Sequence, residues 1–317
     1  MSNSSQENLG TGIINKVFGL YYTVNDGQKD IACFLKGKIR INKEFKKFTN
    51  PVAVGDNVKF QYNDDGSGSI IDLLPRSNLF SRRDKGRNAR EDVIAANLDV
   101  VLVIQSFLDP PVNPRFVDRL AVRAIKENIE PVLCMNKADL ATEEMTNTVI
   151  EYYKNSGLKI IITSALNMQG IDSLKKMLTG KRTLLAGYSG VGKSSLINSI
   201  YQDLNLAVSD ISDKTGKGRH TTTNVIMYKQ KDGTELIDSP GVREFGLVDI
   251  EPEELGNFFY EFTQYRSDCT FSNCTHEHEP GCGVKDRVES GIVCRERYVS
   301  YLNMLESLLE YREQKYR

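Results

Sequence analysis

The sequence predicts a multidomain α/β protein, and three observations lead to this prediction. Short strands separated by turns fill residues 1–75, apolar strands alternate with helices over residues 98–247, and a cluster of cysteines and histidines interrupts the helical residues 248–317. Such patterns are typical of a small β-barrel, a mainly parallel sheet with helices on both faces, and a metal-stabilised helical domain. A chain of 317 residues has room for all three.

The composition restricts the class of protein further. Apolar residues make up 40% and charged residues 26%, which excludes a mainly disordered chain. The first ten residues, MSNSSQENLG, lack a secretion signal, and the apolar runs are far shorter than a membrane span. We therefore expect a cytoplasmic protein without a membrane segment, whose six cysteines are thiols or metal ligands. Because the net charge is −1, contacts to nucleic acid must use local patches.

The first predicted domain, residues 1–75, reads as five short strands without a helix. Asn25-Asp26-Gly27 and the segment 63–66 are turn signals, because Gly, Asn and Asp tolerate the positive φ of tight turns. Five strands favour a barrel of the oligonucleotide-binding (OB) type over an SH3-like barrel. The expected strands are Gly12–Val17, Tyr21–Val24, Ile31–Leu35, Asn57–Tyr62 and Ser69–Leu74.

Two groups of basic residues are candidate contacts to nucleic acid. The first lies in residues 76–97, which we expect to form a mobile basic linker, either solvated or in contact with RNA. Its basic residues are Arg76, Arg82, Arg83, Lys85, Arg87 and Arg90. The second group lies on the barrel and comprises Lys36, Lys38, Arg40, Lys43, Lys46 and Lys47.

Residues 98–247 alternate between apolar strands and helices, which predicts the parallel sheet. The expected elements are Val100–Ile104, Arg115–Asn128, Pro131–Met135, Glu143–Ser156, Lys159–Thr163, Ile171–Met177, Thr183–Ala186, Ser194–Ile200, Asn224–Lys229 and Glu235–Ile237. After Pro252 the chain becomes helical. In its last helix an apolar stripe, which we expect to pack on the rest of the protein, comprises Tyr298, Tyr301, Leu302, Leu305, Leu308 and Leu309.

A phosphate-binding loop lies between the strand ending at Ala186 and the next helix. Its pattern is G-x-x-x-x-G-K-S, in which backbone N–H groups surround phosphate, Lys193 reaches the outer phosphates and Ser194 binds Mg²⁺. The candidate residues are Gly187, Tyr188, Ser189, Gly190, Val191, Gly192, Lys193, Ser194 and Ser195.

The base-binding residues follow two earlier strands. In Asn136-Lys137-Ala138-Asp139 the carboxylate of Asp139 can accept from N1–H and the amine of guanine, while Asn136 meets another edge and Lys137 lies along the ring. Adenine presents the wrong edge and would leave a buried acceptor unpaired, so the nucleotide is GTP. Ser164 and Ala165 can close over the base with backbone N–H groups.

Asp238-Ser239-Pro240-Gly241, about fifty residues after the phosphate loop, is the expected second switch. Asp238 can reach Mg²⁺, usually through water, and the Gly241 N–H can sense the γ-phosphate. The order is unusual, because the base-binding residues precede the phosphate loop. A chain can be opened at one loop and closed at another while its strands stay adjacent, so the site can be the same.

The cluster Cys269-x4-Cys274-x-His276-x5-Cys282 has the composition of a structural zinc site. Three thiolates and one imidazole complete a tetrahedron and leave no open position for a substrate. His278 can replace His276 on spacing alone.

The chain resembles the ribosome small-subunit-dependent GTPase A (RsgA) family from about residue 10 to its C-terminus. The resemblance rests on the permuted motif order, Ala95-Ala96-Asn97, the run Gly218–Thr223 and the Cys/His cluster. It implies a barrel, a circularly permuted GTPase domain and a zinc domain with His276 as ligand. It also implies GTP hydrolysis stimulated by the small (30S) ribosomal subunit during late maturation, with contacts to 16S rRNA. We expect a monomer.

The catalytic residue is the least determined. Ras-like enzymes orient the attacking water with a Gln, but the corresponding residue here is Val242, which cannot hydrogen-bond through its side chain. His220 in the first switch is the candidate to order the water, and contact with RNA is the alternative role. Thr222 is the expected Mg²⁺ ligand of this switch, with Thr221 as the alternative.

Overall fold

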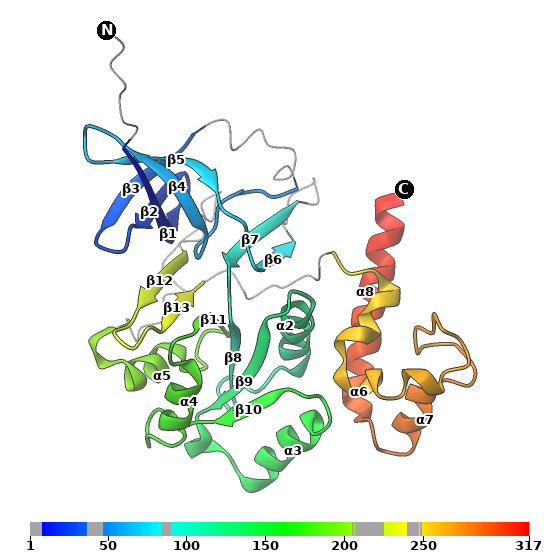
Figure 1. Ribbon diagram of the computed structural model, residues 1–317. Helices are drawn as coiled ribbons and strands as arrows, with labels where there is room; N and C mark the ends of the chain where they lie inside the picture. The colour runs from blue at the N-terminus through cyan, green and yellow to red at the C-terminus, as the bar shows by residue number, and fades with distance from the viewer. Residues whose placement is uncertain are drawn as a thin grey trace. The chain divides into compact units, whose positions relative to one another are not determined.

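The computed structural model describes residues 8–36, 47–83, 90–204, 206, 225–239, 247 and 249–316 (Figure 1). The chain divides into two compact units, each assembled from several stretches of sequence. The first comprises residues 1–100, 177–186 and 209–244, and the second comprises residues 101–176, 187–208 and 245–317.

The first unit begins with a closed five-stranded barrel. Its strands are β1 (Leu9–Phe18), β2 (Tyr21–Asn25), β3 (Asp30–Leu35), β4 (Asn57–Tyr62) and β5 (Gly68–Leu73). They pair in the order β1-β2-β3-β5-β4, and a β1–β4 pairing closes the barrel. β3 and β5 run parallel, whereas the other pairs are antiparallel. This confirms the OB-type barrel, with strand ends within three residues of the predicted ones.

Residues 76–97 contain strands β6 (Leu79–Arg83) and β7 (Glu91–Ala96), which pair antiparallel. The prediction of a mobile basic linker is therefore wrong for residues 76–83 and 90–97. Two of its arginines are engaged by carboxylates: Arg82 binds Asp92 across the hairpin, and Arg76 binds the buried Asp56. Asp56 is distant in sequence, so a local count of charges could not reveal this pairing. Residues 84–89 and the side chain of Arg83 lie outside the described part of the chain.

Three later strands also belong to the first unit: β11 (Arg182–Ala186), β12 (Val225–Lys229) and β13 (Glu235–Asp238). β11 and β13 are parallel, and β12 is antiparallel to β13. β12 also pairs with the barrel strand β1, where Lys16 lies opposite Ile226. The barrel sheet therefore continues into β12, which begins more than 200 positions after the end of β1. This pairing was not predicted from the sequence.

The second unit contains the other predicted strands and helices of residues 98–247. The strands are β8 (Val100–Ser106), β9 (Glu130–Asn136) and β10 (Lys159–Ile162), and the helices are α2 (Pro114–Lys126), α3 (Glu143–Tyr153), α4 (Ile171–Leu178) and α5 (Lys193–Ile200). β9 and β10 are parallel, as expected. Every residue of β8 is buried, as in strands covered on both faces.

The C-terminal part of the second unit is helical. It comprises the 3₁₀ segments Pro252–Phe258 and Arg266–Asp268 and the helices α6 (Tyr260–Thr263), α7 (Gly283–Glu289) and α8 (Arg295–Tyr316). Tyr301, Leu305 and Leu308 of α8 are buried in one cluster with Phe259 and Phe262, which confirms the predicted apolar stripe. Among the described residues, none of the helices has the length and apolar character that crossing a bilayer requires.

Candidate nucleotide and metal sites

The phosphate loop lies between β11 and α5, as predicted. Gly190 and Gly192 have φ of 83° and 82°, a region that glycine adopts without strain. Gly187 has a different requirement, because a Cβ there would lie 2.6 Å from the carbonyl oxygen of Ile104. The side chain of Tyr188 packs on Phe116, with ring centroids 4.4 Å apart. The glycines of the motif thus allow both the turn and the close approach of β8.

Asn136 connects the base-binding motif to the phosphate loop. Its side chain is buried at the end of β9, and Nδ2 donates to the Val191 carbonyl at 3.0 Å. Its Oδ1 accepts from the Thr163 hydroxyl at 3.2 Å. The predicted contact of this amide with the edge of guanine stays a prediction, and in the structure each of its polar atoms binds one protein group. Asn136 therefore positions the two loops relative to each other.

Asp139 and Ser164 lie together at the ends of neighbouring strands. The Ser164 hydroxyl donates to Oδ1 of Asp139 and accepts from the Asn167 N–H at 3.1 Å. Asp139 is exposed, so its carboxylate is accessible to a base. Lys137 has φ of 58°, and its Nζ donates to the carbonyl of Asp109 at 2.5 Å. The structure thus brings three predicted base-site residues to one edge of the second unit.

Asp238 ends β13, and its Cα lies opposite Leu185 of β11, two residues before the phosphate loop begins. This register places the predicted second switch at the same end of the sheet as the start of that loop. The other switch residues, His220, Thr221, Thr222, Gly241 and Val242, lie outside the described residues.

Cys269, Cys274, His276 and Cys282 come together as the sequence predicted, with their ligand atoms within 4.8 Å of one another. Sγ of Cys282 lies 3.4 Å from Nδ1 of His276 and 4.0 Å from Sγ of Cys269. Tetrahedral zinc places such atoms about 3.6–3.8 Å apart, and the two distances differ from this range by only a few tenths of an ångström. The donor set therefore fits Zn²⁺. His278 is exposed and bound to Glu277, away from this set.

Neighbouring residues hold the metal-site loop in place. Gly256 leaves space for the imidazole, because a Cβ there would lie 3.1 Å from Cδ2 of His276. Tyr298 and Tyr301 of α8 donate to the carbonyls of His276 and Thr275. Glu279 accepts from two backbone N–H groups of the loop, those of Thr275 and Glu277. Burial opposes ionisation of Glu279, but these hydrogen bonds lower its pKa to about 2.

Burial also determines the protonation of the ligands in the absence of a cation. It raises the pKa of Cys274 to about 12 and lowers the pKa of His276. The thiol and the imidazole are therefore both neutral at pH 7. A bound dication would deprotonate the thiols, as structural zinc does.

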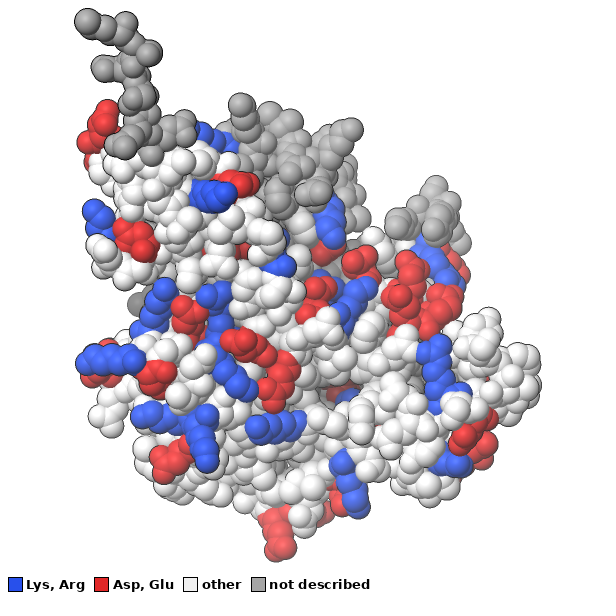
Figure 2. Space-filling view, viewed as in Figure 1, with Lys and Arg blue, Asp and Glu red and all other residues white. Residues whose placement is uncertain are grey.

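Charges of both signs are mixed on the face of the molecule shown in Figure 2. Figure 2 shows Lys and Arg interspersed with Asp and Glu, in agreement with the net charge of −1. In the predicted patch on the barrel, Nζ of Lys36 donates to Oε1 of Gln61, and Nζ of Lys47 lies 3.9 Å from Oε1 of Glu91. The other residues of this patch, 38–46, lie outside the described residues.

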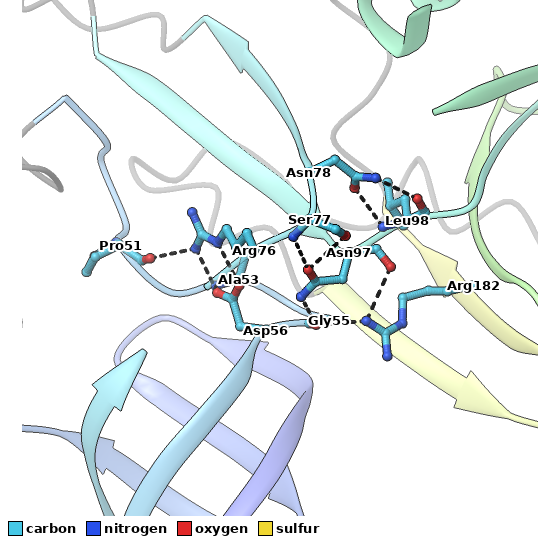
Figure 3. A network of polar contacts seen from close by, with 10 residues as sticks. All are labelled: Pro51, Ala53, Gly55, Asp56, Arg76, Ser77, Asn78, Asn97, Leu98 and Arg182. Atoms are coloured by element: carbon cyan, nitrogen blue, oxygen red, sulfur yellow. Dashed lines mark hydrogen bonds and ion pairs between the residues drawn. The ribbon is translucent and has the colours of Figure 1, made fainter. Parts of the chain in front are cut away.

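The sequence analysis missed a polar network in the first unit (Figure 3). Asn97 has φ of 56°, accepts from the Ser77 N–H and donates to the Gly55 carbonyl. Arg182, the first residue of β11, donates to the carbonyls of Gly55 and Asn97. The only signal in the sequence was Asn97 itself, a polar residue directly after the apolar strand that ends at Ala96.

These features define a class of protein: a circularly permuted P-loop GTPase with an OB-type barrel and a Cys/His metal cluster. The family model described as RsgA GTPase matches residues 73–248, and the model described as RsgA N-terminal domain matches residues 11–70. The chain belongs to the RsgA family of GTPases and is a GTP-hydrolysing enzyme.

Several relatives match almost the whole chain. A protein of Phocaeicola vulgatus named small ribosomal subunit biogenesis GTPase RsgA is 40% identical over 300 residues, covering 93% of this chain and 96% of its own. A protein of the same name from Chlorobaculum tepidum is 40% identical, with coverages of 95% and 98%.

Two solved structures are also similar to this chain over almost its whole length. YjeQ from Thermotoga maritima has a TM-score of 0.74 at 34% identity, covering 95% of this chain and 99% of its own. YloQ, described as a circularly permuted GTPase, has a TM-score of 0.69 at 27% identity, with coverages of 98% and 99%.

Proposed function

We propose that this GTPase acts in late maturation of the small ribosomal subunit, and that the subunit stimulates GTP hydrolysis and is released by it. The observation that carries the proposal is the hydrogen bond from Asn136 to Val191, because it joins a guanine-type motif to a phosphate loop. The names of the relatives indicate the partner. The reaction site and the partner thus come from independent observations.

Within the proposed site, each residue has a distinct task. Asp139 selects guanine, with Ser164 and Ala165 closing over the base, while Lys193 and the loop N–H groups bind phosphate. Ser194 and Thr222 would hold Mg²⁺, with Asp238 reaching it through water. Bound Mg²⁺ neutralises charge on the β- and γ-phosphates. Gly241 senses the γ-phosphate, and His220 orders the attacking water.

GTP turnover with and without small ribosomal subunits tests the proposal. Val242 cannot hold water, so the free protein should turn over at about 10⁻⁴ to 10⁻² s⁻¹, as unassisted GTPases do. Saturating subunits should accelerate it strongly, because a docked switch orients the water. His220→Ala should keep GTP binding and subunit docking and lose most of the stimulation. If it docks and is fully stimulated, the ribosome itself orders the water.

A GTP-gated RNA-binding module without significant turnover is the second candidate, and the valine at position 242 favours it. Single-turnover cleavage distinguishes the candidates, since the module would exchange its nucleotide without hydrolysing it even when subunits are present. A GTPase serving another translation partner is the third. It would follow a different ribosomal fraction on a gradient with a non-hydrolysable GTP analogue.

The metal site is proposed to hold one structural Zn²⁺. Structural zinc contributes about 10 kcal/mol to the folding of small sites at pH 7. Chelation or Cys274→Ser should therefore destabilise the C-terminal region more than the nucleotide site. The matched variant Cys294→Ser, at a thiol outside the cluster, should have little effect. Purified protein without stoichiometric zinc would contradict the assignment.

We place the protein in the cytoplasm as a monomer that contacts 16S rRNA through its basic residues. Phosphate contacts make affinity depend on salt, so binding to subunits should weaken as the salt concentration rises. Because Arg82 is paired with Asp92, the residues outside the described part of the chain, Lys85 and Arg87 among them, are the better candidates for this contact. Lys85→Ala with Arg87→Ala should flatten the salt dependence, whereas Arg82→Ala should not.

A further inference from the structure

Arg182 begins the strand that leads into the phosphate loop, and its side chain binds the barrel. One nitrogen, Nη1, donates to the carbonyl of Gly55 at 2.9 Å and to that of Asn97 at 3.3 Å. Nε donates to Glu235, the first residue of β13, at 2.6 Å. The guanidinium therefore connects a barrel loop to the starts of two strands.

The opposite ends of these two strands carry the nucleotide chemistry. β11 leads from Arg182 directly into Gly187 of the phosphate loop, and β13 leads from Glu235 to Asp238. The strands are parallel and in register, with Arg182 opposite Glu235. β-strands resist compression because each residue adds a fixed rise of about 3.3 Å. We therefore expect a displacement at Arg182 to be carried along β11 to Ala186, the residue before the phosphate loop.

The barrel loop 51–56, which Arg182 contacts, is itself fixed by buried interactions. Asp56 is fully buried and binds Arg76 through two oxygens, and it also accepts from the Ala53 N–H. Gly55 has φ of 92°, and a Cβ there would lie 2.2 Å from the Ala96 carbonyl oxygen. The loop 51–56 thus has little freedom to move without moving the groups that Arg182 binds (Figure 3).

We propose that Arg182 is a positioning residue that transmits the state of the barrel loop 51–56 to the phosphate loop. This rests on the proposed function, in which the small subunit stimulates hydrolysis, and it adds a route by which a partner bound at the barrel loop affects the nucleotide site. Arg182 lies at the end of β11 opposite the phosphate loop and belongs to none of the predicted nucleotide or metal motifs. It acts by binding the carbonyls of Gly55 and Asn97 and the carboxylate of Glu235 with one rigid group. By linkage, nucleotide binding must affect the barrel loop as much as the loop affects nucleotide binding.

Hydrogen exchange provides a test that does not involve the ribosome. In the wild type, a non-hydrolysable GTP analogue should change exchange at the N–H groups of Ala53 and Gly55. Arg182→Lys retains the charge but not the planar set of donors, so this response should disappear. The matched control is Arg82→Lys, which also alters an arginine–carboxylate pair in the first unit, but one whose carboxylate, Asp92, lies on β7 and not on β11 or β13.

Turnover with small subunits is the second measurement. Arg182→Lys should change basal kcat and KM less than twofold and lower the stimulated kcat about tenfold, with docking intact. Asn97→Gly, which suits the positive φ at this position, should act in the same direction and non-additively with Arg182→Lys. It also serves if Arg182→Lys folds poorly.

The outcomes separate the two proposals. If subunits do not stimulate the wild type, the proposed function fails, and hydrogen exchange alone then decides the role of Arg182. A wild-type barrel loop that does not respond to nucleotide would overturn the inference. The inference would also be overturned if Arg182→Lys showed the same hydrogen-exchange response to nucleotide, and the same stimulation of kcat by subunits, as Arg82→Lys.

Discussion

At the scale of single residues, the nucleotide site depends on side chains with one task each. Asp139 has an exposed carboxylate. Its Oδ1 accepts a hydrogen bond from the Ser164 hydroxyl. Asn136, in contrast, is buried, and both Nδ2 and Oδ1 of its side chain form hydrogen bonds with protein groups. The sequence identified both residues, and burial separates the exposed group that we propose to read the base from the buried group that connects the two loops.

Asp139→Asn should shift preference from GTP toward xanthosine triphosphate. The new amide donates where guanine also donates, whereas xanthine offers a carbonyl there. Competition between the two nucleotides for the protein measures the shift, with ATP as the control that should bind neither form. GTP selectivity equal to that of the wild type would remove Asp139 from the base site.

Gly192→Ala should lower GTP affinity more than tenfold. A Cβ at this position would lie 2.5 Å from Nδ2 of Asn136, so it would displace the amide that supports the phosphate loop. The positive φ adds about 1–2 kcal/mol of strain for any other residue. Gly180→Ala is the matched control, since Gly180 has φ of 72° with nothing within 4 Å of its Cβ position.

Isothermal titration with GTP measures both glycine variants. Gly180→Ala should bind GTP like the wild type while losing a similar amount of stability from strain. Equal GTP affinities in the two variants would mean that strain alone, and not contact with Asn136, explains the Gly192 requirement.

At the scale of elements, a buried ionic group connects α2 to α8. Arg297 of α8 donates to Asp118 of α2 at 2.5 Å and also binds Glu261 of α6. Tyr152 of α3 donates to the other oxygen of Asp118. Burial alone would lower the pKa of Arg297, but the two carboxylates raise it above its ordinary value. The guanidinium is charged in the interior and joins four helices.

Arg297→Ala should destabilise the protein by about 3–5 kcal/mol, because it leaves two buried carboxylates without their cation. Lys154→Ala is the control, since it removes a charge whose pairing with Glu151 is exposed and worth about 0.5 kcal/mol or less. Urea unfolding of both variants measures the difference. A loss below about 1 kcal/mol for Arg297→Ala would show that the group contributes little to stability.

At the scale of the whole molecule, the barrel contacts residues that lie beyond the predicted boundary near residue 75. β1 of the barrel pairs with β12, Arg76 binds Asp56, and Arg182 binds the Gly55 carbonyl. All of these groups belong to the first unit. The barrel and the strands β11–β13 therefore form one compact body.

Deleting residues 1–75 should lower the melting temperature of the remaining chain or cause it to aggregate. The deletion removes the partner of β12 and leaves Arg76 and Arg182 without their barrel contacts. Deleting residues 1–7 is the control and should leave the melting temperature unchanged. Circular dichroism in the presence of GDP measures both. If the chain without residues 1–75 melted within a few degrees of the wild type, the barrel and the strands β11–β13 would not form a single folding unit.

The sequence by itself determined the strands and helices apart from β6 and β7, the OB-type barrel, the position of the phosphate loop and the four members of the Cys/His cluster. These depend on residues within a few positions of one another, where spacing, turn residues and apolar periodicity act directly.

The tertiary structure alone decided the β1–β12 pairing, the ion pair of Arg76 with Asp56, the orientation of Asn136 and the contacts of Arg182. Each joins residues between 20 and more than 200 positions apart. Such pairings depend on which surfaces become buried together in the folded chain. The sequence alone does not indicate whether a polar residue will bind water or a buried group. For that reason the sequence indicated a mobile linker where the structure has a strand pair held by carboxylates.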